Sequence, residues 1–167
     1  MKTIARPILA ALGRLLSGHV VVRGDSMLPG LRTGHYLMVD RMAYVLRAPK
    51  RGDVVVVKGE VGGPTRHLKR VVGLPGEEVT IGEGRVSVGG SGLNEPYLAG
   101  RPAASGLEEG RWNVSEGEVF VLGDNRMAST DSRDNGPVAR ARIEGKAWLC
   151  YWPLAQFSQI GGRSRKR

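Results

Sequence analysis

Beyond Gly18, glycine and proline divide the chain into short runs of strand-forming residues, and this division constrains the fold more than any other feature. The runs that concentrate β-branched and aromatic residues are 19–23, 36–39, 53–58, 67–72, 78–81, 85–88 and 118–122. The sequence Gly82-Glu83-Gly84 between two of them is typical of a β-hairpin, and 89–92 indicates a loop. Helical segments alternating with the strands, which a parallel sheet requires, are absent from the sequence. We therefore expect a mainly β chain built from antiparallel sheets.

A length of 167 residues predicts one domain, large enough to form a hydrophobic core without disulfides. The single cysteine, Cys150, excludes an intramolecular disulfide and is expected to be a small buried hydrophobic residue. No group of cysteine and histidine residues has the spacing of a zinc site. Two local features complete this prediction: a short helix at 40–46 with Asp40 as its N-cap, and a linker-like stretch at 98–110.

The segment before Gly18 has the periodicity of an amphipathic helix of about three turns. Its apolar positions are Ile8, Leu9, Leu12, Leu15 and Leu16. Arg6, Pro7 and Arg14 interrupt the run of about 20 apolar residues that a spanning helix needs, and Arg14 also argues against a cleaved signal peptide. Two placements stay open: the helix packs on the domain, or it lies on a lipid surface.

The net charge of +9 is concentrated at the two ends of the chain. The terminal basic residues are Lys2, Arg6, Arg14, Arg163, Arg165, Lys166 and Arg167. Basic ends suit an anionic membrane surface or simply solvated tails. Because the body lacks a basic stripe interleaved with aromatic residues, no nucleic-acid partner is expected.

Two polar residues occupy positions where chemistry is possible. Ser26 follows Gly24 in a turn at the end of a strand, which exposes a hydroxyl, although a serine in such a turn is usually only a turn residue. Strand alternation places Lys69 on the same face as Val71. If that face is buried, desolvation lowers the lysine pKa and lets a neutral amine accept a proton from a serine. The alternative is a strand lysine that reaches out to water.

A third segment, 123–136, follows a strand with more hydrogen-bonding side chains than a simple turn requires. Such a loop can orient other side chains. The alternative is a solvated loop stabilised by Asx turns and an ion pair between Asp131 and Arg133.

Taken in order, the three segments resemble the bacterial type I signal peptidases, the Ser/Lys serine endopeptidases that remove signal peptides at the membrane. The matching boxes are Ser26-Met27-Leu28-Pro29, 69–76 (Lys-Arg-x-Val-Gly-x-Pro-Gly) and 123–133 (Gly-Asp-Asn-x-x-x-Ser-x-Asp-Ser-Arg). The segment Arg51-Gly52-Asp53-Val54-Val55 also looks like the family's pattern, and the likeness covers most of 20–153.

The resemblance implies roles for the residues in these boxes. Ser26 would be the nucleophile, with its backbone N–H in the oxyanion hole, and Lys69 the general base. Ser129 would orient the Lys69 amine, supported by an ion pair of Asp131 with Arg133 and by Asp124. No metal or organic cofactor is implied. The chain departs from the family at Gly24, where some members carry a hydroxyl donor, and at Asn135, where an aromatic residue is common.

The resemblance also implies a compact signal-peptidase-like, LexA-related β fold, with 1–18 as an N-terminal membrane-proximal helix, 19–157 as the peptidase domain and 158–167 as a basic tail. Substrates would be exported precursors whose signal peptides end in an Ala-x-Ala pattern, bound extended beside a strand. The catalytic domain would lie on the outer face of the cytoplasmic membrane, next to lipid. Candidates for lipid contact are Met27, Leu28, Trp148, Tyr151 and Trp152, and the alternative for each of them is a place in the core.

Three other functions are compatible with parts of this pattern. A dedicated maturation protease acting on one precursor would keep the same Ser/Lys pair. A self-cleaving LexA-like repressor is disfavoured, because no DNA-binding helix-turn-helix precedes the domain and the Asp131-Ser132-Arg133 box is foreign to it. An inactive membrane-binding or polyanion-binding module would explain the basic ends but not the three boxes.

Overall fold

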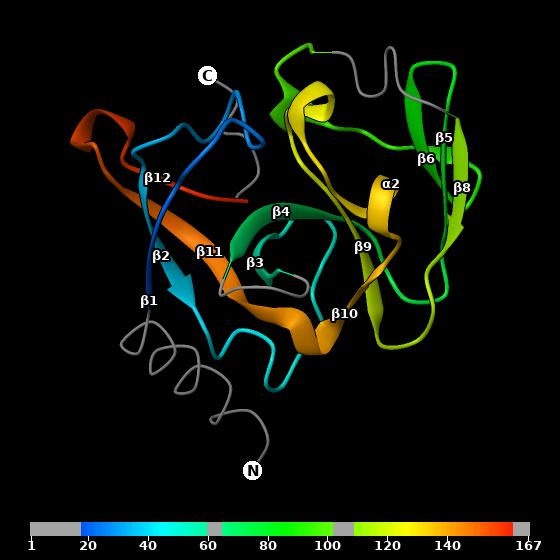
Figure 1. Ribbon diagram of the computed structural model, residues 1–167, viewed down its shortest axis with the longest axis horizontal. Helices are drawn as coiled ribbons and strands as arrows, with labels where there is room; N and C mark the ends of the chain where they lie inside the picture. Colours follow the sequence, from blue (N-terminus) through cyan, green and yellow to red (C-terminus); the bar gives the residue numbers. More distant parts are fainter. Residues whose placement is uncertain (1–17, 60–64, 102–108, 162–167) are drawn as a thin grey trace.

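The computed structural model describes residues 18–59, 65–101 and 109–161, which form two antiparallel sheets (Figure 1). The larger sheet has the strand order β1-β2-β11-β3-β4-β9-β10, with β12 paired to β11. Its strands are β1 (Gly18–Val21), β2 (Tyr36–Asp40), β3 (Val54–Lys58), β4 (Arg66–Gly73), β9 (Glu118–Leu122), β10 (Val138–Ala139), β11 (Ile143–Trp152) and β12 (Ser158–Gln159). The prediction of a mainly β, antiparallel chain is confirmed.

The smaller sheet lies beside β9 in Figure 1 and has the order β7-β6-β5-β8. Its strands are β5 (Glu78–Gly82), β6 (Arg85–Val88), β7 (Ser91–Gly92) and β8 (Gly110–Asn113). The described helices are short: α2 (Ser132–Asn135), η1 (Pro96–Leu98), η2 (Arg126–Ala128), η3 (Arg140–Arg142) and η4 (Leu154–Gln156). The predicted hairpin is present, and both Glu83 and Gly84 have positive φ angles, as a two-residue hairpin turn requires.

The core forms on both faces of β3, which explains why 54–57 is a continuous valine run instead of an alternating one. Val54 and Val56 pack in one cluster with Leu37 and Met27, whereas Val55 belongs to a second cluster on the other face. A third cluster connects the two sheets through Val79, Val86, Val72, Phe120 and Leu122. Cys150 is buried in the first cluster, as predicted.

The predicted helix at 40–46 is wrong, because residues 41–47 form turns. Asp40 ends β2, and its carboxylate accepts a hydrogen bond from Met42 N at 2.9 Å, as in an Asx turn. Arginine side chains bind carbonyl groups of these turns: Arg47 Nε donates to Ala43 O and Arg140 Nη2 donates to Arg47 O. Part of the predicted loop at 89–92 is also wrong, since Ser91–Gly92 pair with β6 as β7.

Of the two placements left open for Met27, lipid contact or core, the structure shows the core, because its side chain is buried among core residues. The predicted N-terminal helix lies outside the described residues, as do 102–108 of the linker-like stretch and most of the basic tail.

Candidate active site

Ser26 sits in the turn that follows β1, held by its neighbours on both sides. Gly24 takes a positive φ of 79°, a conformation that favours glycine, and its carbonyl accepts a hydrogen bond from Thr33 Oγ1. The buried Met27 side chain anchors the residue after Ser26 in the core. The turn therefore presents a partly exposed serine from a fixed backbone.

Lys69 lies in β4, opposite Val55 of β3, and is only 6% exposed. Burial lowers the pKa of Lys69, an effect that the negative charge of Asp131 partly opposes. Its Nζ donates a hydrogen bond to Ser129 Oγ over 2.7 Å. The lysine thus does not extend into water, and the predicted contact with Ser129 is present.

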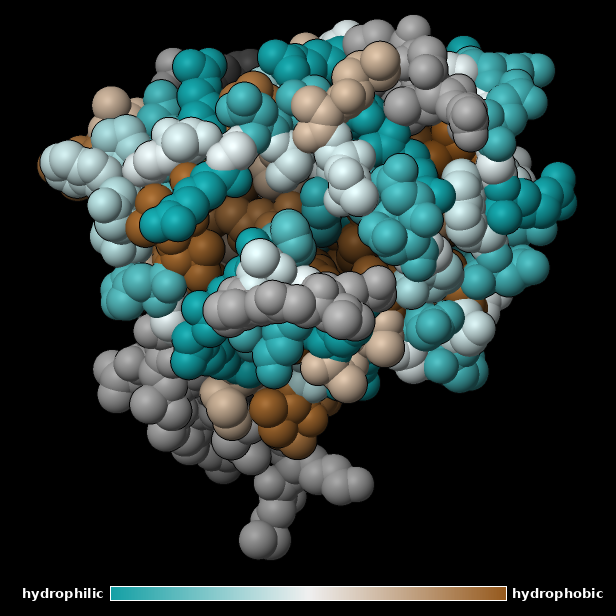
Figure 2. Space-filling view, viewed as in Figure 1, coloured by the Kyte–Doolittle hydropathy of each residue, from teal (hydrophilic) through white to brown (hydrophobic). Residues whose placement is uncertain are grey.

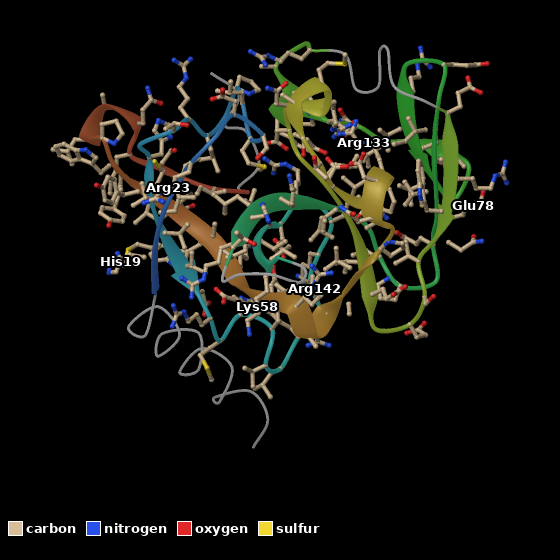
Figure 3. The ribbon with its side chains drawn as sticks, in the orientation of Figure 1. His19, Arg23, Lys58, Glu78, Arg133 and Arg142 are labelled. Atoms are coloured by element: carbon tan, nitrogen blue, oxygen red, sulfur yellow. The ribbon has the colours of Figure 1, made fainter. Side chains whose placement is uncertain are left out.

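The loop after β9 is held in shape by the carboxylate of Asp131. Arg133 Nε donates to Asp131 Oδ1 at 2.8 Å, and Gly123 N donates to Asp131 Oδ2 at 2.9 Å. Arg133 Nη2 also donates to the backbone oxygen of Ser129 at 2.9 Å. The predicted ion pair therefore exists, and it fixes the residue that contacts Lys69. Arg133 belongs to α2 and is labelled in Figure 3.

The same loop contacts the turn that carries Ser26. Asn125 N donates to Ser26 O at 2.9 Å, and Asn125 Nδ2 donates to Asp25 O at 3.1 Å. A Cβ atom at Gly123 would lie 2.2 Å from Ser129 Oγ and 2.7 Å from Ser26 O. Only glycine allows this close approach, so Gly123 permits the turn that carries Ser26 and the loop that carries Ser129 to pack together.

If Ser26 and Lys69 act as the resemblance implies, Gly123→Ala is expected to lower kcat by about 100-fold, because the added methyl group must displace Ser129 or the Ser26 backbone. The measurement is steady-state cleavage of a peptide with the Ala-x-Ala pattern that the resemblance implies. Gly92→Ala is the control, because a Cβ atom at Gly92 has no neighbour within 4 Å among the described residues and Gly92 has no positive φ. Gly117 would be a poor choice, because its φ is positive. Wild-type kcat in a folded Gly123→Ala protein would show that this approach is not needed.

Asp124 does not face Lys69; it forms a buried ion pair with Arg70, the next residue along β4. Arg70 Nε and Nη2 donate to the two carboxylate oxygens at 2.7 and 2.6 Å. The sequence analysis assigned no role to Arg70, although strand alternation places it on the face opposite to Lys69. Asn135 ends α2 with an exposed side chain and lines the cleft described next.

Two clefts meet at Ser26. One, of about 400 Å³, is lined by Ser26, Lys69 and Ser129. The other, of about 570 Å³, is lined by apolar residues of β1, β3 and β4 together with Ser26 and Met27. Arg23 and His67 line both clefts. Figure 2 shows this face of the molecule hollowed near its centre, with hydrophobic residues below a hydrophilic rim. A serine, a buried lysine and a cleft together can perform nucleophilic acyl transfer.

Comparison with known proteins decides the family. Residues 2–152 match the family described as signal peptidase, peptidase S26. The chain belongs to this signal peptidase family. It is 34% identical over 168 residues to signal peptidase I of Bacillus caldolyticus, covering 93% of this chain and 90% of that relative. It is also 34% identical over 166 residues to probable signal peptidase I-2 of Synechocystis sp., covering 95% and 75% of the two chains.

The fold of this signal peptidase also matches a solved relative. The crystal structure of a signal peptidase I from Enterococcus faecalis V583 superimposes with a TM-score of 0.52 at 34% identity, covering 60% of this chain and 97% of that one. The predicted family and signal-peptidase-like fold are confirmed, and the chain is a serine endopeptidase of the signal peptidase I type.

Proposed function

We propose that this signal peptidase cleaves exported precursors with Ser26 as nucleophile and Lys69 as general base. The observation that carries the proposal is a buried lysine with a lowered pKa, hydrogen-bonded to Ser129 in the cleft that Ser26 also lines. A lysine in water is protonated at neutral pH and cannot accept a proton, whereas desolvation disfavours the charged form and so raises the neutral fraction of the amine.

The reaction follows from these groups in two steps. Neutral Lys69 takes the Ser26 hydroxyl proton while Oγ bonds to the scissile carbonyl carbon, and the same proton passes to the leaving amine as the C–N bond breaks. Lys69 then removes a proton from water as the water oxygen bonds to the acyl carbon, and it passes this proton to Ser26 Oγ as the acyl C–O bond breaks. The backbone N–H of Ser26 donates to the oxyanion, and Gly24 adds no side-chain donor to it.

The apolar cleft suits an extended peptide, because strand edges flank it. Within the described part of the chain, β1 pairs only with β2. The strand β4 begins to pair with β9 at Arg70, so its residues 66–69 have no described strand partner on the side that faces away from β3. Main-chain groups of both edges can therefore bind a substrate strand. Val22, Met27 and Leu68 supply an apolar lining for the small side chains before the scissile bond.

The test is cleavage of a peptide with one Ala-x-Ala site by the full chain in detergent, with the product masses measured. The proposal predicts one cut, directly after the second alanine, and no cut when that alanine is replaced by a bulky residue. A folded protein that cuts no such peptide but matures one particular precursor would instead be a dedicated maturation protease. Cleavage at unrelated sites would contradict the assignment.

We also propose that the domain contacts lipid on the outer face of the cytoplasmic membrane. No helix in the described part of the chain is long and apolar enough to cross a membrane. Three large apolar side chains, Trp152, Leu154 and Phe157, are 51%, 71% and 61% exposed and lie close together in sequence at the end of β11 and just after it. Exposed aromatic and aliphatic residues of this kind are typical of a membrane interface.

Replacing both Trp152 and Phe157 with serine is expected to weaken binding to vesicles of phosphatidylcholine and phosphatidylglycerol by about 100-fold, because burial of each aromatic side chain contributes about 1.5 kcal/mol. Sedimentation of the full chain with vesicles measures this effect. Met127→Ser, at another exposed apolar position, is the matched control. Equal binding of both variants and wild type would place the lipid contact elsewhere.

A further inference from the structure

The segment that follows the smaller sheet contributes a charged side chain, Glu95, that contacts the loop carrying Ser129. Glu95 is the N-cap residue of η1, which follows β7 of the smaller sheet. Its carboxylate pairs with Arg126 of η2, with 2.5 Å between Oε1 and Nη2 and 3.2 Å between Oε2 and Nη1. The two side chains are 3% and 2% exposed, so the pair is almost completely removed from water.

Arg126 connects this pair to the loop that holds Ser129. Its Nε donates to the carbonyl of Gly123 at 2.9 Å, and its own carbonyl accepts from Arg133 Nη1 at 2.8 Å. Gly123 is the residue packed between Ser129 and Ser26, and Arg133 binds the backbone of Ser129. The orientation of Arg126 therefore determines where the Ser129 hydroxyl lies.

Tyr97 connects the same segment to the strand that carries Lys69. Its hydroxyl donates to Glu95 Oε1 at 2.5 Å, and burial together with the Glu95 charge raises the pKa of Tyr97, so the hydroxyl stays protonated. The Arg70 guanidinium lies over the Tyr97 ring, 3.9 Å from its centroid. Arg70 adjoins Lys69 in β4. The segment therefore reaches Lys69 through Arg70, and it reaches Ser129 through Arg126 followed by Arg133.

We infer that Glu95 is a positioning residue of this peptidase: its buried pair with Arg126 holds the Ser129 loop against β4 and so keeps Lys69 desolvated and aimed at Ser26. The inference rests on the proposed roles of Ser26 and Lys69. Glu95 is distant from the reacting groups in sequence and acts only through Arg126 and Tyr97.

The test is Glu95→Gln, which keeps the side-chain shape but removes its charge. We expect kcat to fall by about 100-fold with KM within about twofold, because a misplaced catalytic group affects the chemical step more than substrate binding. We also expect the acid limb of the pH–kcat profile to move to higher pH, since a loosened loop admits water to Lys69. Glu95→Asp, which keeps the charge, restores part of kcat.

Glu78→Gln is the matched control, because Glu78 pairs with Arg111 on the exposed surface of the smaller sheet, where Figure 3 labels it. It should leave kcat and the acid limb unchanged. If Glu95→Gln does not fold, the double variant Glu95→Leu/Arg126→Leu decides, because replacing both members of a buried pair by apolar residues preserves stability far better than breaking it. The folded double variant should remain slow, since Gly123 O has lost its donor.

The inference would be overturned if folded Glu95→Gln or the folded double variant had wild-type kcat and an unchanged acid limb. The Glu95–Arg126 pair would then contribute to stability alone. The proposed function fails in a different way, namely if Ser26→Ala or Lys69→Met cleaves as wild type does. The two failures are therefore distinguishable in one set of assays.

Discussion

Ser26→Ala is expected to abolish cleavage, with kcat reduced by about a million-fold, the loss that follows removal of the nucleophile in other serine peptidases. In the proposed mechanism the Ser26 hydroxyl oxygen forms the acyl bond, and no other described hydroxyl lines both clefts. The fold should persist, because the structural contact of Ser26 is its carbonyl, which accepts from Asn125 N and is retained in alanine.

Product release from the Ala-x-Ala peptide measures this loss, with circular dichroism and thermal unfolding confirming that the variant is folded. Ser91→Ala makes the same chemical change at an exposed position of the smaller sheet and should cleave normally. Cleavage by Ser26→Ala within about tenfold of wild type would identify another nucleophile.

Lys69→Arg is expected to reduce kcat by about a million-fold, the loss seen when the base of a serine peptidase is removed. It preserves the positive charge that an ordinary lysine would carry, but a guanidinium stays protonated and cannot act as a base. Lys69→Met is a companion that keeps the apolar stem and removes the amine.

Both Lys69 variants should stay inactive at every pH at which the protein is folded, whereas wild-type activity rises toward alkaline pH. Arg51→Lys, in a half-exposed ion pair with Glu77, tests whether an arginine–lysine exchange by itself disturbs cleavage, and it should not. Substantial activity in Lys69→Arg would mean that Lys69 serves only as a charge, and the base would have to be sought elsewhere.

The residues predicted for the active site could be found from sequence because each is embedded in a compact motif. The contacts of Ser129 with Lys69 and of Asp131 with Arg133 then appear in the structure where the boxes place them. The structure explains why residue 123 is glycine: a side chain there would collide with Ser129 and with the backbone of Ser26. The sequence alone does not show that these two loops pack together.

The Glu95–Arg126 pair could not be predicted, because its partners are 31 residues apart and no periodicity connects them. The long strand β11 was missed for a local reason: its first half reads Ile-Glu-Gly-Lys, and bulges shift its register against β2 and β3. Gly145 is needed there, since a Cβ would lie 2.6 Å from Asp40 O. The division into 1–18, 19–157 and 158–167 stays a prediction.

The most direct test of the account compares the pKa of the Lys69 amine with the pH dependence of kcat in the same buffers. NMR measures this pKa from the chemical shift of the Lys69 Cε, and the signal is assigned by its loss in Lys69→Met. Protonation removes the base, so kcat must fall as pH drops through the lowered pKa of Lys69. The account predicts that Lys69 titrates below the usual lysine value of about 10.4 and that its midpoint coincides with the acid limb of kcat. A Lys69 that titrates as an ordinary lysine, while kcat is already maximal at lower pH, would contradict it.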